Sequence, residues 1–170
     1  MKHEYEHLLF EGQKGTVNNK YRIEDVEVRK QTLIPDDRGF LMEMLRPDWD
    51  IFRNWGQVYA TMCYPGVVKG WHYHFHQIDF FNCVSGMAKV CLFDNRPDSS
   101  TAGIINEFVI GPMNPLMIKI PTEVWHGFTA VGNEPAIIIN CPTEKYNYKV
   151  PDEYRAPADA FGYKWSDVSG

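Results

Sequence analysis

The chain lacks the features of a membrane protein or of a nucleic-acid-binding protein. No apolar stretch approaches the ~20 residues that span a bilayer, and the N-terminal segment has none of the apolar character of a signal peptide. Positive charge is not in excess, since 17 Lys and Arg stand against 22 Asp and Glu. This balance argues against nucleic acid or an anionic membrane as a partner, although it leaves room for a local basic pocket that binds phosphate. We therefore expect a cytoplasmic protein.

The chain also has no Cys-x-x-Cys pair. Its four cysteines are far apart in the sequence and lie in or next to strand-like runs. We interpret them as reduced thiols, which agrees with a cytoplasmic location. They are Cys63, Cys83, Cys91 and Cys141.

Signals for helices are scarce, and short strand-like runs separated by turn residues occupy most of the chain. Residues 47–52 alone predict a helical turn, because a proline stands in its first turn. Many short strands at this spacing predict an all-β fold, a closed barrel or jelly roll that encloses a cavity. The expected strands are 21–33, 39–45, 56–63, 67–74, 78–84, 87–94, 104–110, 116–120, 124–131 and 136–141.

We expect a single folded domain with two appendages. A length of 170 residues is enough for one domain with a substantial core. Residues 1–20 are expected to form an N-terminal arm, residues 21–150 the jelly-roll domain, and residues 151–170 a tail that packs on the barrel or on a dimer partner.

Four of the six histidines gather in two places. His72, His74 and His76 alternate in one run, and His126 follows Pro121 by five residues. Because alternate side chains of a strand share a face, His72 and His74 should point the same way, while we expect His76 to face solvent. Imidazole serves both proton transfer near neutral pH and metal ligation. The sequence therefore predicts one polar, histidine-lined site inside the β-structure.

Asp79 completes a candidate metal site. Together, His72, His74, Asp79 and His126 offer three nitrogens and one oxygen, a set that suits Mn, Fe, Zn or Ni. The order of His-x-His, acid, Gly and then Pro and His resembles the two motifs of the cupin superfamily. Asp79 stands where that pattern usually has Glu, and Glu123 stands where it usually has Gly. The same residues can also form a hydrogen-bonded pocket without a metal, and both interpretations stay open.

Four longer segments carry a more specific signal. They are Asp37-Arg-Gly-Phe-Leu-Met-Glu43, Gly66-Val-Val-Lys-Gly-Trp-His-Tyr73, Gln77-Ile-Asp-Phe-Phe-Asn-Cys-Val-Ser-Gly86 and Ile120-Pro-Thr-Glu-Val-Trp-His-Gly-Phe128. In order and spacing they resemble the dTDP-4-dehydrorhamnose 3,5-epimerase family, from about residue 26 to residue 154. The resemblance implies a cupin jelly roll, a homodimer, a substrate that is a nucleotide-linked 4-keto-6-deoxy sugar, and no required metal or organic cofactor.

The resemblance also implies roles for substrate-binding residues. Arg38, contributed across the dimer, and Lys69 would contact the diphosphate, whose negative charge calls for cations. Glu43 and Gln57 would help to hold the base and the sugar. We add Tyr146 to this substrate-binding set.

His72 would be the general base that removes a proton next to the ketone, a task that suits a neutral histidine. His126 would line the pocket beside the keto oxygen. Asp79, which we keep as a catalytic candidate, stands where the family has a lysine that stabilises the enolate. A metal ion held by His74 and Asp79 is one replacement for that lost cation.

Two further family groups lack a counterpart in the sequence. The tyrosine that returns the proton aligns with Ile139, and the C-terminal segment with another carboxylate is missing. Four tyrosines are candidates for the replacement acid: Tyr59, Tyr73, Tyr146 and Tyr148.

Our leading interpretation is an isomerase that epimerises or isomerises a nucleotide-linked 4-keto sugar through an enolate, with His72 as the base. One alternative is a metal-dependent cupin enzyme that acts on another small carbonyl substrate. A second alternative is a sugar-binding cupin without catalytic activity.

Overall fold

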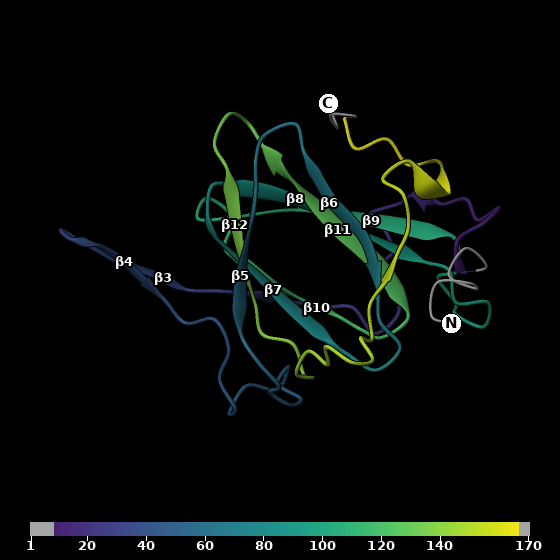
Figure 1. Ribbon diagram of the computed structural model, residues 1–170. Helices are drawn as coiled ribbons and strands as arrows, with labels where there is room; N and C mark the ends of the chain where they lie inside the picture. Colours follow the sequence, from purple (N-terminus) through teal and green to yellow (C-terminus); the bar gives the residue numbers. More distant parts are fainter. Residues whose placement is uncertain (1–8, 167–170) are drawn as a thin grey trace.

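Two β-sheets face each other and form a jelly-roll sandwich (Figure 1). The computed structural model describes residues 9–166, so the first eight residues of the expected arm and the last four of the expected tail lie outside the described residues. The six-stranded sheet has the order β1(Thr16–Val17), β9(Ile104–Ile110), β8(Met87–Asp94), β11(Val124–Val131), β6(Val68–Tyr73) and β13(Tyr154–Arg155). The five-stranded sheet has the order β2(Glu27–Lys30), β10(Leu116–Ile120), β7(Asp79–Ser85), β12(Ala136–Asn140) and β5(Tyr59–Cys63).

The expected strands from residue 56 onward match β5 to β12 to within a few residues. The expectation of one strand over 21–33 is wrong, because Asp25 takes a φ of 67° and the chain turns before β2 begins. Residues 47–52 form no helix. Two successive turns stand there instead, in which the Trp49 amide donates to the Arg46 carbonyl and the Phe52 amide to the Trp49 carbonyl.

Three clusters of apolar side chains fill the space between and outside the sheets. The cluster between the sheets includes Phe81 and Phe128. Outside the six-stranded sheet, residues of the C-terminal segment cover Trp71 and Trp125, which alternate with the site histidines and point away from them. Outside the five-stranded sheet, residues 45–51 cover Phe80. Burial on both faces explains why β7, β8 and β11 read as nearly continuous apolar runs.

Two turns fix how the site strands are connected. Gly86 has a φ of 67°, and a Cβ there would lie 2.2 Å from the Pro135 carbonyl oxygen, so only glycine fits between β7 and β8. Glu123 keeps the left-handed backbone that the cupin pattern usually gives to glycine, with a φ of 62°. Its amide donates to the His74 carbonyl at 2.7 Å, which ties the start of β11 to the end of β6.

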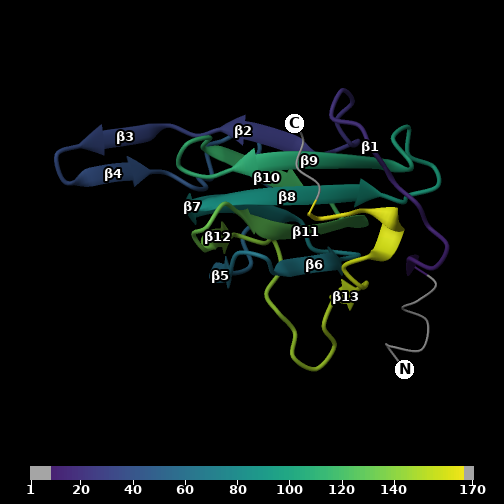
Figure 2. The ribbon, with the colours of Figure 1, turned by 90° about the horizontal axis from the view of Figure 1, so that it is seen from above.

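A hairpin projects from the sandwich. It consists of β3(Leu33–Asp36) and β4(Gly39–Met42), and it extends away from both sheets (Figures 1 and 2). The 3-10 turn η2(Ala160–Gly162) lies on the outer side of the six-stranded sheet. Within residues 9–166, no helix has the length and apolar character needed to cross a bilayer.

Candidate active site

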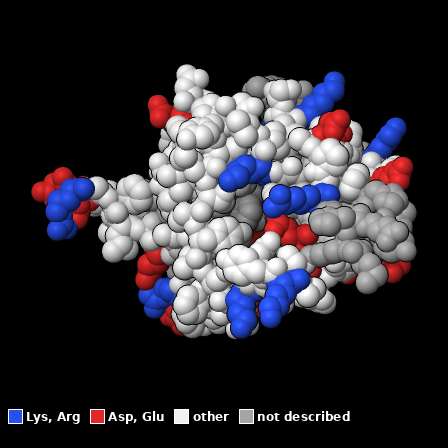
Figure 3. All heavy atoms as spheres, viewed as in Figure 1, with Lys and Arg blue, Asp and Glu red and all other residues white. Residues whose placement is uncertain are grey.

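A cavity of about 720 Å³ opens between the two sheets. β6 carries His72 to one wall, the connection that follows β6 adds His74, and β11 adds His126. β5 and β7 carry Tyr59 and Phe81 to the other wall. The segment 144–155 borders the opening. Figure 3 shows this face as a hollow with basic side chains beside an acidic patch.

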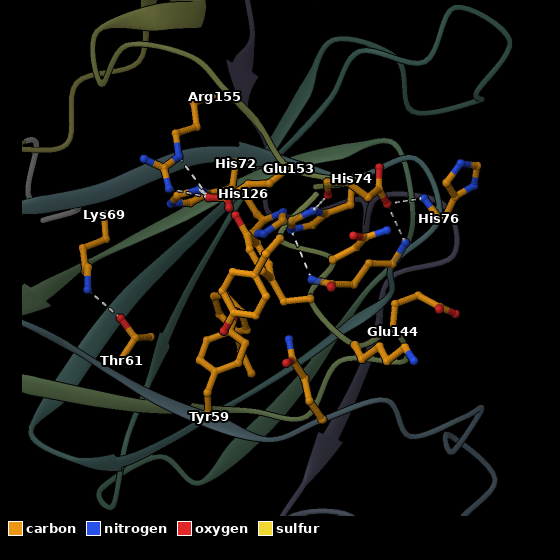
Figure 4. A pocket seen from close by; sticks show the side chains of 18 of the residues that line it. Tyr59, Thr61, Lys69, His72, His74, His76, His126, Glu144, Glu153 and Arg155 are labelled. Carbon is orange, nitrogen blue, oxygen red and sulfur yellow. Dashed lines mark hydrogen bonds and ion pairs between the residues drawn. The ribbon is translucent and has the colours of Figure 1, made fainter. Parts of the chain in front are cut away.

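His72 pairs with a carboxylate from the C-terminal segment. Its Nδ1 lies 3.3 Å from Glu153 Oε1, which leaves Nε2 for a substrate (Figure 4). Arg155 holds the same carboxylate oxygen through two N–H donors at 2.9 and 2.7 Å. Burial lowers the pKa of His72 and outweighs the opposing effect of Glu153, so the ring is neutral at pH 7. A neutral imidazole oriented by a carboxylate is the arrangement of a general base.

Asp79 sits at the centre of a second, buried cluster. Its Oδ2 lies 3.1 Å from His126 Nε2 and 3.4 Å from His74 Nε2. Its Oδ1 accepts hydrogen bonds from the side-chain amides of Asn140 at 2.7 Å and Gln77 at 2.8 Å. Every oxygen of this 1% exposed carboxylate therefore has donors around it.

Both histidines of this cluster have oxygen atoms beside each ring nitrogen. His126 Nδ1 lies 3.1 Å from the Val124 carbonyl oxygen, and His74 Nδ1 contacts the Asp152 carbonyl oxygen. For His74, acceptors at both nitrogens favour the ring in which both carry a proton.

The electrostatics of the Asp79–His74 pair follow from this geometry. Burial alone would lower the pKa of His74, but the charge of Asp79 and the hydrogen bonds to Asp79 and Asp152 outweigh it and raise the pKa to about 8. Burial would raise the pKa of Asp79, but the two histidines facing it hold that pKa well below its usual range. The site thus contains an ion pair between Asp79 and His74 at neutral pH.

Three of the four expected metal ligands come together, and the fourth stands apart. The ligand atoms of His74, Asp79 and His126 all lie within 4.8 Å of one another. His72 turns instead toward Glu153. Any ion held by this cluster would therefore have the three ligands His74, Asp79 and His126.

Most of the expected substrate-binding residues border the cavity. Lys69 lies on its wall and donates to Thr61 Oγ1 at 2.6 Å, and Gln57 and Tyr146 lie near the opening. Lys69, Lys145 and Arg155 supply positive charge around the cavity. His76, expected to face solvent, is exposed at the rim.

Arg38 and Glu43 do not reach the cavity of their own chain. Arg38 lies at the tip of the β3–β4 hairpin with its side chain 84% exposed, and it pairs with Asp36. Glu43 follows β4 and pairs with Arg46 at 2.6 Å. Their expected roles would require a second copy of the chain.

Sequence reasoning missed Glu153. It assigned the surrounding segment to the barrel surface or to a dimer contact and found no carboxylate for the base. The signal was present as alternation, because Glu153, directly before β13(Tyr154–Arg155), and Arg155 are two residues apart, and Arg155 is opposite His72 in the register with β6. A two-residue strand is too short for that pattern to stand out.

Comparisons with known proteins agree with this architecture. The model of the polysaccharide biosynthesis C-terminal domain family matches residues 34–154. The probable low-salt glycan biosynthesis epimerase Agl13 of Haloferax volcanii is 48% identical over 139 residues, covering 81% of this chain and 89% of that protein. The spore coat polysaccharide biosynthesis protein SpsL of Bacillus subtilis is 39% identical over 146 residues, covering 85% and 97%.

Solved structures show the same fold. A dTDP sugar isomerase from Desulfovibrio desulfuricans G20 superposes with a TM-score of 0.81 at 31% identity, covering 86% of this chain and 94% of that chain. Enzymes described as dTDP-4-dehydrorhamnose 3,5-epimerases match at 21% and 19% identity, a level at which the likeness concerns the fold.

The buried pair predicts a specific pH dependence of stability. The contribution of Asp79 to the free energy of unfolding is present above the ordinary carboxyl pKa of 3.8. It is lost as the pH falls through the depressed pKa of Asp79 in the folded protein. The contribution of His74 to the free energy of unfolding is complete below pH 6.5, its ordinary pKa, and is lost as the pH rises through its raised pKa of about 8. We expect Asp79→Asn to lower the free energy of unfolding at pH 6 by about 3 kcal/mol.

Urea unfolding at pH 6 and at pH 8.5 measures this effect. Asp79→Asn should remove most of the wild-type decline in stability between these two pH values. Asp98→Asn, at an exposed position, is the control and should change stability by less than about 0.5 kcal/mol. An Asp79→Asn variant as stable as wild type at pH 6 would contradict the ion pair.

Proposed function

Since the chain belongs to the dTDP-4-dehydrorhamnose 3,5-epimerase family of cupins, we propose that it epimerises a dTDP-linked 4-keto-6-deoxy sugar. The match to the polysaccharide biosynthesis C-terminal domain family agrees with this assignment. The observation that carries this proposal is the place of His72 on the cavity wall, with Nδ1 held by Glu153. Burial lowers the pKa of this ring, which favours its neutral form. A base of this kind can remove the weakly acidic proton from the carbon next to a ketone.

The enolate formed by that step needs hydrogen-bond donors at its oxygen. His74 and His126 line the same cavity as His72, with ring centroids 5.3 Å apart from each other. The Nε2 atoms of both rings face Asp79 Oδ2, and their Nδ1 atoms face backbone carbonyls. We propose that the keto oxygen lies beside these rings and shares their Nε2 protons with Asp79, since preorganised donors stabilise developing negative charge.

The remaining lining residues fit a nucleoside diphosphate. Lys69, Lys145 and Arg155 can neutralise phosphate charge. Tyr146 and Tyr148 lie at the opening in an edge-to-face pair with centroids 4.9 Å apart, and Tyr146 offers a ring to a nucleobase. Gln57 adds an amide that can bond a base or sugar.

Variants of the general base His72 and of its partner Glu153 test the proposed reaction. His72→Asn should abolish the exchange of the proton next to the ketone of dTDP-4-keto-6-deoxyglucose in D₂O, followed by proton NMR. Glu153→Gln should lower kcat by about 10- to 100-fold, because it removes the group that orients the base. Since Glu153 raises the pKa of His72, its loss should also move the acid limb of the kcat/KM profile to lower pH.

The exposed His76→Asn is the matched control and should retain exchange. Exchange by His72→Asn at the wild-type rate would exclude His72 as the base. Tight binding of the substrate by the wild-type protein without any exchange would instead indicate a sugar-binding protein without catalytic activity.

We further propose a homodimer that completes the pocket. The β3–β4 hairpin exposes Ile34, Phe40 and Leu41 at 55%, 47% and 58%. β5, at the edge of its sheet, exposes Met62 at 42%. Apolar groups exposed on a projecting hairpin and on a sheet edge are typical of an interface between chains. Arg38 at the hairpin tip would then reach the diphosphate of the partner.

Complementation tests this arrangement. Arg38→Ala and His72→Asn proteins, each with little activity alone, should regain about a quarter of wild-type activity when unfolded and refolded as an equal mixture, since half the dimers are mixed and each has one intact site. Light scattering should give twice the chain mass. No recovery in a mixture that contains mixed dimers would place Arg38 outside the partner's pocket.

A metal-dependent variant of the reaction is the second candidate. The His74–Asp79–His126 cluster supports it, because backbone carbonyls hold the Nδ1 atoms of both histidines, as is common for metal-binding histidines. A bound divalent ion would supply positive charge beside the keto oxygen.

Elemental analysis of the purified protein separates the two candidates. About one Mn, Fe, Zn or Ni ion per chain, lost in His74→Ala, would support the metal-dependent reaction. Our leading proposal predicts only trace metal and exchange that is insensitive to a chelator.

A further inference from the structure

Tyr59 lies on the wall of the cavity that faces the histidines. It comes from β5 in the five-stranded sheet, whereas His72 and His126 come from β6 and β11 in the other sheet. Figure 4 shows the Tyr59 ring directed into the space below the histidines. The two sides of a substrate bound between the sheets would therefore meet different side chains.

The direction of the Tyr59 hydroxyl proton follows from its partner. Asn140 accepts from the Phe80 amide through Oδ1 at 2.9 Å, which identifies the other end of its side chain as Nδ2. Nδ2 donates to Tyr59 Oη at 2.9 Å and to Asp79 Oδ1 at 2.7 Å. Tyr59 thus accepts from Asn140, and its own proton is available to a group in the cavity.

The other tyrosines that sequence reasoning considered are placed less well. Tyr73 follows His72 on β6, and its side chain is buried on the outer face of the six-stranded sheet, away from the cavity. Tyr146 and Tyr148 lie at the rim, where Tyr148 is 88% exposed. A proton donor to an enolate works best where its position is fixed, and the Asn140 amide holds the Tyr59 hydroxyl on the wall opposite the histidines.

Inversion at a carbon needs one group on each face of the enolate. We propose that Tyr59 is the acid that returns a proton to the face opposite His72, an inference that rests on the proposed epimerase function. Asn140 and Asp79 position its hydroxyl for this step.

The step balances as follows. His72 Nε2 takes the proton from the carbon next to the ketone, and the electron pair of that C–H bond forms the C=C bond of the enolate while the carbonyl π pair moves to oxygen. The carbonyl then re-forms, the C=C pair takes the Tyr59 hydroxyl proton on the opposite face, and Tyr59 is left as a phenolate. Water returns a proton to Tyr59 and removes one from His72.

Burial and the nearby charge of Asp79 raise the pKa of Tyr59. The hydroxyl is therefore fully protonated before each turnover, and the phenolate has a strong tendency to regain its proton from water. The Asn140 amide remains as a donor to the transient phenolate oxygen.

Tyr59→Phe separates proton removal from inversion. With dTDP-4-keto-6-deoxyglucose in D₂O, proton NMR measures both deuterium uptake and the configuration of the product. We expect Tyr59→Phe to retain uptake within about 10-fold of wild type while inversion falls by at least about 100-fold, since an acid in place contributes rate factors of this size. Tyr73→Phe, which removes a hydroxyl from the outer face of the sheet, should retain both.

Two results would overturn the assignment. Inversion by Tyr59→Phe at a rate near that of wild type would show that another group returns the proton. Loss of both uptake and inversion, in a variant that unfolds at the wild-type temperature and binds dTDP normally, would place Tyr59 in the first step. Failure of wild type itself to take up deuterium would instead remove the proposed function.

Discussion

The buried carboxylate of Asp79 is the interaction on which the rest of the site depends. An isolated carboxylate cannot remain ionised at 1% exposure, so the surrounding strands must supply donors to it. They do so from both sheets, through His126 on β11 and Asn140 on β12, and through His74 and Gln77 in the connection between β6 and β7. The carboxylate therefore links residues of both sheets beside the cavity and orients the side chains that donate to it.

The same cavity contains two groups of titratable side chains with opposite behaviour. His72 and His74 are two residues apart, yet burial lowers the pKa of the first while Asp79 raises that of the second to about 8. Glu153 is held by Arg155 and can orient His72 without protonating it, whereas Asp79 has no cationic partner other than the histidines within the described residues. Environments that push neighbouring pKa values apart separate a base from hydrogen-bond donors, which is what enolate chemistry requires.

The sequence predicted the sandwich well because its strands are short, apolar and bounded by turn residues, and because Gly86 and His126 occupy positions that the cupin pattern demands. It also brought His74, Asp79 and His126 together correctly. It could not separate His72 from that group, because the strand period places His72 and His74 on one face and says nothing about rotamers or partners. Glu153 escaped notice because it lies next to a strand of only two residues, β13. Tyr59 could not be distinguished from three other tyrosines without knowing which wall of the cavity each one faces.

The exchange of the family's lysine for Asp79 also limits how the enolate can be stabilised. An Asp79 carboxylate with one imidazolium has no net charge, so the Asp79–His74 pair supplies no net positive field to the keto oxygen. A divalent ion on the same three ligands, with both rings neutral, would instead give the cluster a charge of about +1. The imidazolium and the metal ion differ in how their charge can be removed. The proton of an imidazolium exchanges with solvent at every turnover, whereas a bound ion stays in place. A site that uses imidazolium donors must therefore be sensitive to pH near neutrality, and a site that uses a metal must be sensitive to chelation instead.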